Sequence, residues 1–178
     1  YYDGFDYRDQ ELSRRELDTL RRRNIINDLH ASSLHNLDLS SELWASSVTM
    51  ESFQPDLENI IIALQSNLSL VSVRISNDVL AAIRESDQGR LFRIVGNLPT
   101  LEYMSVSGDT GSRTAIHTRV LADALSETSN GIKILELSGL KISGRSEVEQ
   151  LARGLKARVG TLRMLTLEHI VLDVEDSS

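Results

Sequence analysis

The hydrophobic positions of this chain repeat one short pattern five times. In each copy an apolar residue is followed by two spacers, a second apolar residue, one spacer and a third apolar residue. The copies are Leu34-x-x-Leu37-x-Leu39, Leu68-x-x-Val71-x-Val73, Leu101-x-x-Met104-x-Val106, Ile132-x-x-Leu135-x-Leu137 and Leu162-x-x-Leu165-x-Leu167. Their first positions are separated by 34, 33, 31 and 30 residues. A near-constant period of this length is typical of proteins built from tandem structural units.

Each copy predicts a strand that is followed by a helix. The last two apolar residues of a copy alternate with polar ones, as in a strand with one buried face. Downstream, apolar residues recur at spacings of three and four, which indicates helices. We expect these helices to begin near Pro55, near Ser86 or Asp87, and at a capping box formed by Ser146 and Glu149. Strand, helix and strand at this period predict parallel pairing, with the helices on one side of the sheet.

Further apolar residues follow the last two copies, at Leu140, Ile142, Ile170 and Leu172. With these residues and the five copies, the chain resembles leucine-rich repeat proteins of the ribonuclease-inhibitor-like subclass. The resemblance covers residues 31–172. It implies an α/β solenoid shaped as a horseshoe, with a parallel β-sheet on the concave face and helices on the convex face. It also implies a surface suited to binding other proteins.

The two ends of the chain differ from the middle. Residues 1–30 are predicted to form a tail and a capping helix, because residues 11–29 are helix-like and mix apolar with charged side chains. Residues 31–172 are predicted to form about five repeats, and residues 173–178 an acidic tail. No helix follows the last copy. We therefore expect its sheet edge to be exposed, unless a partner or residues missing from a truncated chain cover it.

Composition narrows the classes of partner. The formal net charge of −7 argues against a nucleic-acid binder, whose surface is expected to be basic. Asp28, Asp38, Glu42, Glu51, Asp56 and Glu58 lie in a stretch between Arg23 and Arg74 that has no Lys or Arg, which favours a partner of basic character. Without cysteine the chain forms no disulfide, so we expect an intracellular rather than a secreted protein. The longest aliphatic run, residues 60–64, is too short to span a membrane.

The candidate chemistry in the chain is sparse. Asp109-Thr110-Gly111-Ser112 matches the tetrapeptide of aspartic proteases, but that reaction needs two carboxylates and one copy is present. We interpret it as a loop between a strand and a helix. The four histidines have no metal-ligand spacing, and no phosphate-binding loop with its lysine occurs. Asn67-Leu68-Ser69 matches a glycosylation sequon by chance. We therefore predict no enzyme activity, metal or cofactor.

The spacer residues of the strands predict a binding surface. Alternate residues share one face, so the spacers that directly precede the second apolar residue of each copy form a column on the concave face: Asn36, Leu70, Tyr103, Ile134 and Met164. Four successive apolar members predict a protein-binding stripe. Asp38, Glu136 and Glu168 beside it would set its polarity. The alternative is that this column packs under the loops that precede the strands.

Two functions follow from this surface. The first is a non-enzymatic scaffold or accessory subunit that holds a partner on the concave sheet or at the open C-terminal edge. The alternative is a regulatory module, because some similar horseshoes are GTPase-activating proteins. Asp109 and Arg113 in the loop are the candidate residues for that activity.

Overall fold

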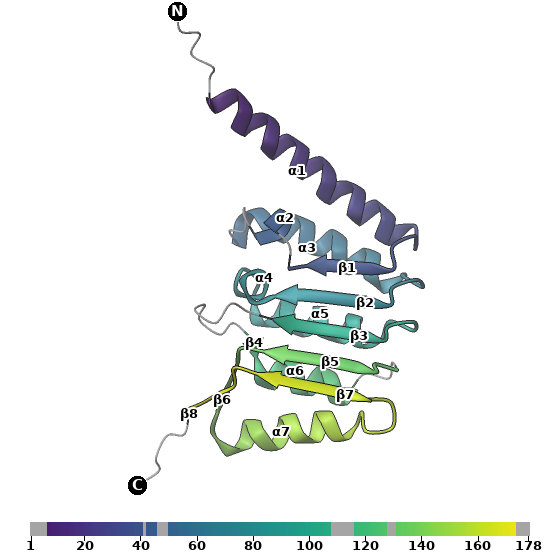
Figure 1. Ribbon diagram of the computed structural model, residues 1–178, viewed down its shortest axis with the longest axis vertical. Helices are drawn as coiled ribbons and strands as arrows, with labels where there is room; N and C mark the ends of the chain where they lie inside the picture. The colour runs from purple at the N-terminus through teal and green to yellow at the C-terminus, as the bar shows by residue number, and fades with distance from the viewer. Residues whose placement is uncertain (1–6, 41, 46–49, 108–115, 128–130, 174–178) are drawn as a thin grey trace, which may run out of the picture.

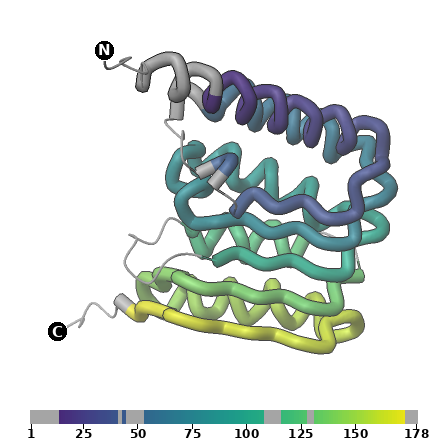
Figure 2. Tube along the Cα trace, turned by 45° about the horizontal axis from the view of Figure 1, so that its top comes forward, coloured from purple at the N-terminus to yellow at the C-terminus, as the bar shows by residue number. Residues whose placement is uncertain are grey.

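The computed structural model describes residues 7–40, 42–45, 50–107, 116–127 and 131–173 of the 178-residue chain. The main sheet has five strands in the order β1-β2-β3-β5-β7, and each printed pair is parallel. Strands that succeed one another along the chain therefore lie side by side, as the colours of Figure 2 show. The strands are β1 (Asn36–Leu39), β2 (Ser72–Ser76), β3 (Tyr103–Ser107), β5 (Ile134–Ser138) and β7 (Met164–Glu168). The predicted α/β class with a parallel sheet is confirmed.

The longer helices between these strands lie on one face of the main sheet (Figure 1). They pack on one another in chain order, α3 on α5, α5 on α6 and α6 on α7. This arrangement follows from the parallel strands, because each connection must bring the chain back to the end of the sheet at which every strand begins. The helices are α1 (Tyr7–His30), α2 (Glu42–Ala45), α3 (Met50–Gln65), α4 (Asn77–Ala81), α5 (Glu85–Gly96), α6 (Thr118–Glu127) and α7 (Gly144–Lys156).

A second, smaller parallel sheet has the order β4-β6-β8. It comprises β4 (Ile116–His117), β6 (Leu140–Ser143) and β8 (Val171–Asp173). The sequence pattern marks its apolar positions Leu140, Ile142 and Leu172 but does not predict that they form strands. Leu140 and Ile142 are buried, whereas Leu172 is exposed.

Strand pairing corrects the second copy of the repeated pattern. Val73 is paired in register with Leu37 of β1 and with Met104 of β3. The copy in β2 is therefore Leu70-x-x-Val73-x-Ile75, two residues later than predicted. The first positions of the five copies are 34, 70, 101, 132 and 162.

The physical reason for this error is the period of a strand. Side chains alternate between faces every residue, so a shift of two residues keeps the same set of positions on the buried face. The burial of side chains separates the two registers: Leu68 and Val71 are exposed, whereas Leu70 and Ile75 are fully buried.

The helices approach one another closely where glycine allows it. A Cβ atom added at Gly154 of α7 would lie 2.7 Å from the backbone oxygen of Ala122 in α6. At Gly89 of α5 it would lie 3.2 Å from a methyl of Val120 in α6. Arg158, which follows α7, is buried and donates from Nε to the Leu125 carbonyl at the end of α6, over 2.9 Å. The helix layer is thus packed tightly as far as α7.

Two predicted helix starts are wrong. Pro55 lies inside α3, which begins at Met50. The helix α7 begins at Gly144, where φ is +81°, so the predicted capping box of Ser146 and Glu149 does not form. Instead the Ser143 backbone N–H donates to Glu147 at 2.6 Å. Gly144 adopts a left-handed conformation that is costly for other residues, and the helix begins there. The start of α7 is therefore closer to the preceding strand than predicted.

The two edges of the main sheet differ. The helix α1 lies at the β1 end in both views (Figures 1 and 2), and Leu29 and Ile26 in its last turns are buried. Leu17 and Leu20, farther toward its N-terminus, are exposed, so only the end of the predicted capping helix contributes to the core. At the other edge Leu165 and Leu167 of β7 are exposed, as predicted for the last copy. In the described part of the chain, no helix combines the length and apolarity needed to cross a membrane.

Candidate binding face of the sheet

One face of the main sheet points away from α3, α5, α6 and α7. The side chains on this face form columns that run across the strands. The strand register aligns the side chains because residues paired between neighbouring parallel strands point to the same face. One column contains Asn36, Ser72, Tyr103, Ile134 and Met164, and the next contains Asp38, Arg74, Ser105, Glu136 and Thr166. Among the described elements, no helix covers this face in Figure 1. We refer to these ten residues as the open face.

The open face corrects one predicted site residue. Leu70 was expected in the first column, but it is fully buried, and Ser72 occupies that place between Asn36 and Tyr103. The cause is the two-residue shift of the copy in β2. The predicted stripe of four apolar residues is therefore reduced to Tyr103, Ile134 and Met164, which are adjacent in register.

A row of interacting side chains crosses three strands of the open face. The guanidinium carbon of Arg74 lies 5.3 Å from the centre of the Tyr103 ring, a cation–π geometry. The Tyr103 hydroxyl donates to the Glu136 carboxylate at 2.5 Å. Burial first, and then this bond to a carboxylate, raise the pKa of Tyr103 above its ordinary value, because both favour the neutral phenol. Arg74, Tyr103 and Glu136 thus hold one another in place.

Sequence reasoning missed Arg74 as a member of this row. In the copy Leu68-x-x-Val71-x-Val73, Arg74 directly follows the last apolar residue, the place that Ser107 and Glu168 hold in their own copies. In the structure Arg74 is paired with Asp38 and Ser105. The sequence contains the signal for the correct place of Arg74. The segment Leu70-x-x-Val73-x-Ile75 matches the repeated pattern as well as the predicted copy Leu68-x-x-Val71-x-Val73 does.

The apolar members differ in how far they are covered. Met164 is 53% exposed, whereas Tyr103 and Ile134 are half-buried by their neighbours. Ser105, between Arg74 and Glu136, is buried. Apolar surface is therefore available mainly at the β5–β7 side of the open face.

The predicted acidic residues do not form one cluster. Asp38 is exposed on β1 and accepts bonds from the backbone N–H of Ser40 at 2.8 Å and from the Ser40 hydroxyl. Glu136 is on β5, beside Tyr103, and Glu168 is exposed at the end of β7. Arg74 is the one basic residue among the open-face columns, and Glu136 and Glu168 lie on the two strands that carry Ile134 and Met164.

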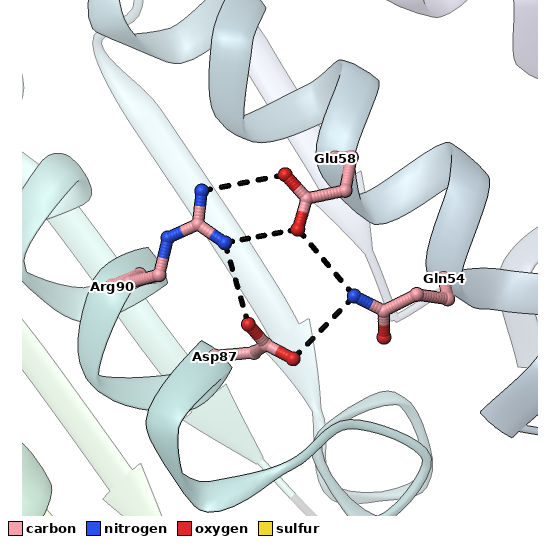
Figure 3. A network of polar contacts seen from close by, with 4 residues as sticks. All are labelled: Gln54, Glu58, Asp87 and Arg90. Atoms are coloured by element: carbon pink, nitrogen blue, oxygen red, sulfur yellow. Dashed lines mark hydrogen bonds and ion pairs between the residues drawn. The ribbon is translucent and has the colours of Figure 1, made fainter.

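The helix layer has its own polar network, which ties neighbouring helices. Arg90 donates to both oxygens of Glu58, over 2.9 and 3.3 Å, and to Asp87 at 3.4 Å (Figure 3). Gln54 donates to Glu58 and to Asp87 on the other side of the network. The pKa of Glu58 is lowered, chiefly by its bond from Arg90. The network joins α3 to α5.

Similar pairs recur along the helix layer. Arg22 of α1 lies 3.1 Å from Asp56 of α3, and Arg93 of α5 lies 2.8 Å from Glu127 of α6. Each pair bridges two helices that pack on each other, α1 on α3 and α5 on α6. We attribute a structural role to both pairs, because each links two neighbouring helices; the exposed pair of Arg93 and Glu127 is expected to contribute modestly to stability.

Other candidate chemistry is limited in the described residues. No group of three His, Cys, Asp or Glu there is placed to hold a metal ion. Asp109, Thr110, Gly111, Ser112 and Arg113 lie outside the described residues, so the protease tetrapeptide and the loop of the regulatory alternative are not placed. Asn67 of the sequon is buried, and its amide donates to the Leu29 carbonyl at 2.9 Å. It is therefore a structural residue in this fold.

Comparison with protein-family models gives no match for this chain. Comparison with curated proteins gives no match either.

Proposed function

We propose that the chain is a leucine-rich-repeat solenoid of the horseshoe type that acts as a non-enzymatic protein-binding scaffold. In this proposal the open face is the concave surface, and it holds an extended, basic segment of a partner protein. The fold part of the proposal is supported by five parallel strands in chain order, with the repeated apolar positions in register and helices on one side.

One observation carries the function. Tyr103, Ile134 and Met164 form a continuous column on an uncovered face, and Glu136 and Glu168 flank it. Aromatic and Met side chains are enriched at the centres of protein interfaces, where they supply most of the binding energy. Carboxylates at the rim select partners of opposite charge and speed their encounter. The complementary ligand is a peptide with Lys or Arg next to apolar residues.

A peptide selection tests this. We expect a random peptide library displayed on phage and panned on the chain to yield peptides that combine basic and apolar residues. Synthetic copies should lose at least about tenfold in affinity when Tyr103 and Met164 are both changed to Ser, because two anchors are removed. Glu136→Gln should weaken binding and reduce its dependence on salt.

The matched control is Ile62→Ser, which removes an exposed apolar side chain from α3 on the helix side. It should leave peptide affinity unchanged. Circular dichroism should show equal helicity for all variants. Peptides that bind the double variant as well as the wild type, or that are acidic, would show that the open face is not the binding surface.

The regulatory alternative depends on Asp109 and Arg113, which the structure does not describe. No described residue adds support to it, so the scaffold is the function proposed.

A further inference from the structure

The strand β7 differs from the other strands of the main sheet in the exposure of the side chains that point to the helix side. Leu165 and Leu167 are 39% and 40% exposed, whereas the side chains at the equivalent positions of the other four strands are at most 2% exposed. These equivalents are Leu37, Val73, Met104 and Leu135 for Leu165, and Leu39, Ile75, Val106 and Leu137 for Leu167.

The backbone of β7 is also incompletely paired. The Met164 N–H donates to the Lys133 carbonyl, and the Glu168 carbonyl accepts from the Gly139 N–H. In a parallel sheet alternate residues direct both backbone groups to the same neighbour. Met164, Thr166 and Glu168 therefore face β5, and the N–H and C=O groups of Leu165 and Leu167 face outward. No described strand lies on that side.

Apolar surface continues from this edge onto the rest of the last unit. Val148 and Val159 are exposed on and just after α7, and Val171 and Leu172 are exposed on β8. A sheet edge with free backbone groups and adjoining apolar side chains is the typical template for pairing with another chain.

We propose that a second copy of this chain covers this edge, with the two β7 strands paired antiparallel about a two-fold axis at Thr166. In this register Leu165 of one copy is opposite Leu167 of the other. Those are the residues whose N–H and C=O groups face outward, so the two leucines exchange both backbone hydrogen bonds. Their side chains then cover each other on the helix side of a continuous ten-stranded sheet.

The charges of the last unit favour self-association. The chain as a whole carries −7, but residues 144–173 contain five Lys or Arg and four Asp or Glu, so two copies meet there with little repulsion. Glu147 lies in the first turn of α7, and Arg153 and Lys156 lie in the last turn. Two α7 helices that run antiparallel across the axis bring acidic ends beside basic ends and oppose their dipoles.

A head-to-tail stack of copies is disfavoured by the opposite edge. Leu37 and Leu39 of β1 are already buried, and α1 lies at that end of the molecule. The β1 edge therefore offers no exposed leucine pair to match Leu165 and Leu167 of another copy, whereas a second β7 edge does, which favours the closed two-fold pair. This proposal concerns the strand edge and does not rest on the function proposed for the open face.

An engineered disulfide tests the register, since the chain has no cysteine of its own. Thr166 of one copy is opposite Thr166 of the other as a pair without hydrogen bonds, where Cα atoms are about 4.5 Å apart, which suits a disulfide. Under mild oxidation Thr166→Cys should form a covalent dimer at least about tenfold faster than the matched control Ser72→Cys, on the same face of β2. The tenfold margin is our order-of-magnitude expectation for a paired against an unpaired thiol.

Sedimentation of the wild-type chain should show a monomer–dimer equilibrium within about 1–100 µM. Leu165→Lys should shift the chain to monomer with unchanged circular dichroism, because the long lysine side chain can extend into solvent from this half-exposed position. A wild type that stays monomeric over this range would overturn the proposal. So would a dimer that Leu165→Lys leaves intact, or a Thr166→Cys variant that crosslinks no faster than the control.

Discussion

The first strand of the main sheet, β1, and the last, β7, carry the same apolar pattern but have different surroundings. Leu37 and Leu39 on β1 are buried, with the last turns of α1 at that end and β2 on the other side. Leu165 and Leu167 on β7 are exposed, with β5 on one side and no described strand on the other.

This contrast shows that a repeated pattern marks residues that are suited to burial but does not bury them. In a stack of parallel units each strand contacts its neighbours, so interior units share their core with two others and an end unit shares it with one. The N-terminal end is closed by a helix from outside the repeat pattern. The C-terminal end retains an apolar edge, for which we propose a second copy.

The comparison is tested most strongly by the same substitution at both ends. Leu39→Ala should lower the free energy of unfolding by about 2–5 kcal/mol, because it removes fully buried methyl groups and leaves a cavity. Leu167→Ala should lower it by about half as much or less, since its side chain already contacts solvent. Urea denaturation at several protein concentrations measures both losses, and extrapolating the free energy of unfolding to low concentration removes any contribution from self-association. Equal losses at dilution would contradict the difference between the two ends.

Gly154→Ala tests whether the last unit is tightly packed on its inner side. The new methyl would lie 2.7 Å from the Ala122 backbone oxygen, so α7 must shift away from α6. Overpacking of this kind costs about 1–3 kcal/mol and outweighs the gain of up to about 1 kcal/mol from replacing a helix glycine. The control is Gly160→Ala, where a methyl meets no atom within 4 Å. If thermal denaturation shows the two variants equally stable, the α6–α7 contact is looser than described.

Asn67→Ala tests the link between the N-terminal helix and the first units. Its amide donates to the Leu29 carbonyl, and its carbonyl accepts from the N–H groups of Ser69 and Leu70, each at 2.9 Å. Leaving such buried groups unpaired costs about 1–3 kcal/mol. The exposed Asn36→Ala should change stability by no more than about 0.5 kcal/mol. Hydrogen exchange of α1 should accelerate in Asn67→Ala alone, and an unchanged rate would show that the side chain does not hold α1 in place.

The smallest effect is expected midway between the two ends, at Tyr103. Its pKa is raised, so it should lose its proton above the ordinary value of about 10. The folded state then binds the proton more tightly than the unfolded state. The stability from this group is therefore complete below the unfolded pKa and is lost as pH rises through the folded pKa.

Subtracting the tyrosinate absorbance of Tyr103→Phe from that of the wild type isolates this group from the other three tyrosines. Glu136→Gln should bring the midpoint closer to the ordinary value, since it removes the negative charge that accepts a hydrogen bond from the phenol and disfavours its ionisation. A wild-type midpoint at the ordinary value would argue against the bond between Tyr103 and Glu136.

Much of the fold was predictable because the period of apolar residues and the parallel order of strands have a direct physical link. Alternation within each copy indicated strands, and apolar residues at spacings of three and four between the copies indicated helices. Tyr103, Ile134 and Met164 were placed correctly in one column. Leu70 was not, because a two-residue slip is invisible to a pattern of period two.

The sequence by itself determined that strand and helix alternate, which face of each strand is apolar, and that the sheet is parallel, since these follow from local spacing and from connection length. The tertiary structure alone decided the register of β2, the row of Arg74, Tyr103 and Glu136, the small sheet and the exposure of β7. Those features depend on which residues of distant segments become neighbours, and the spacing of residues within one segment carries no information about its neighbours.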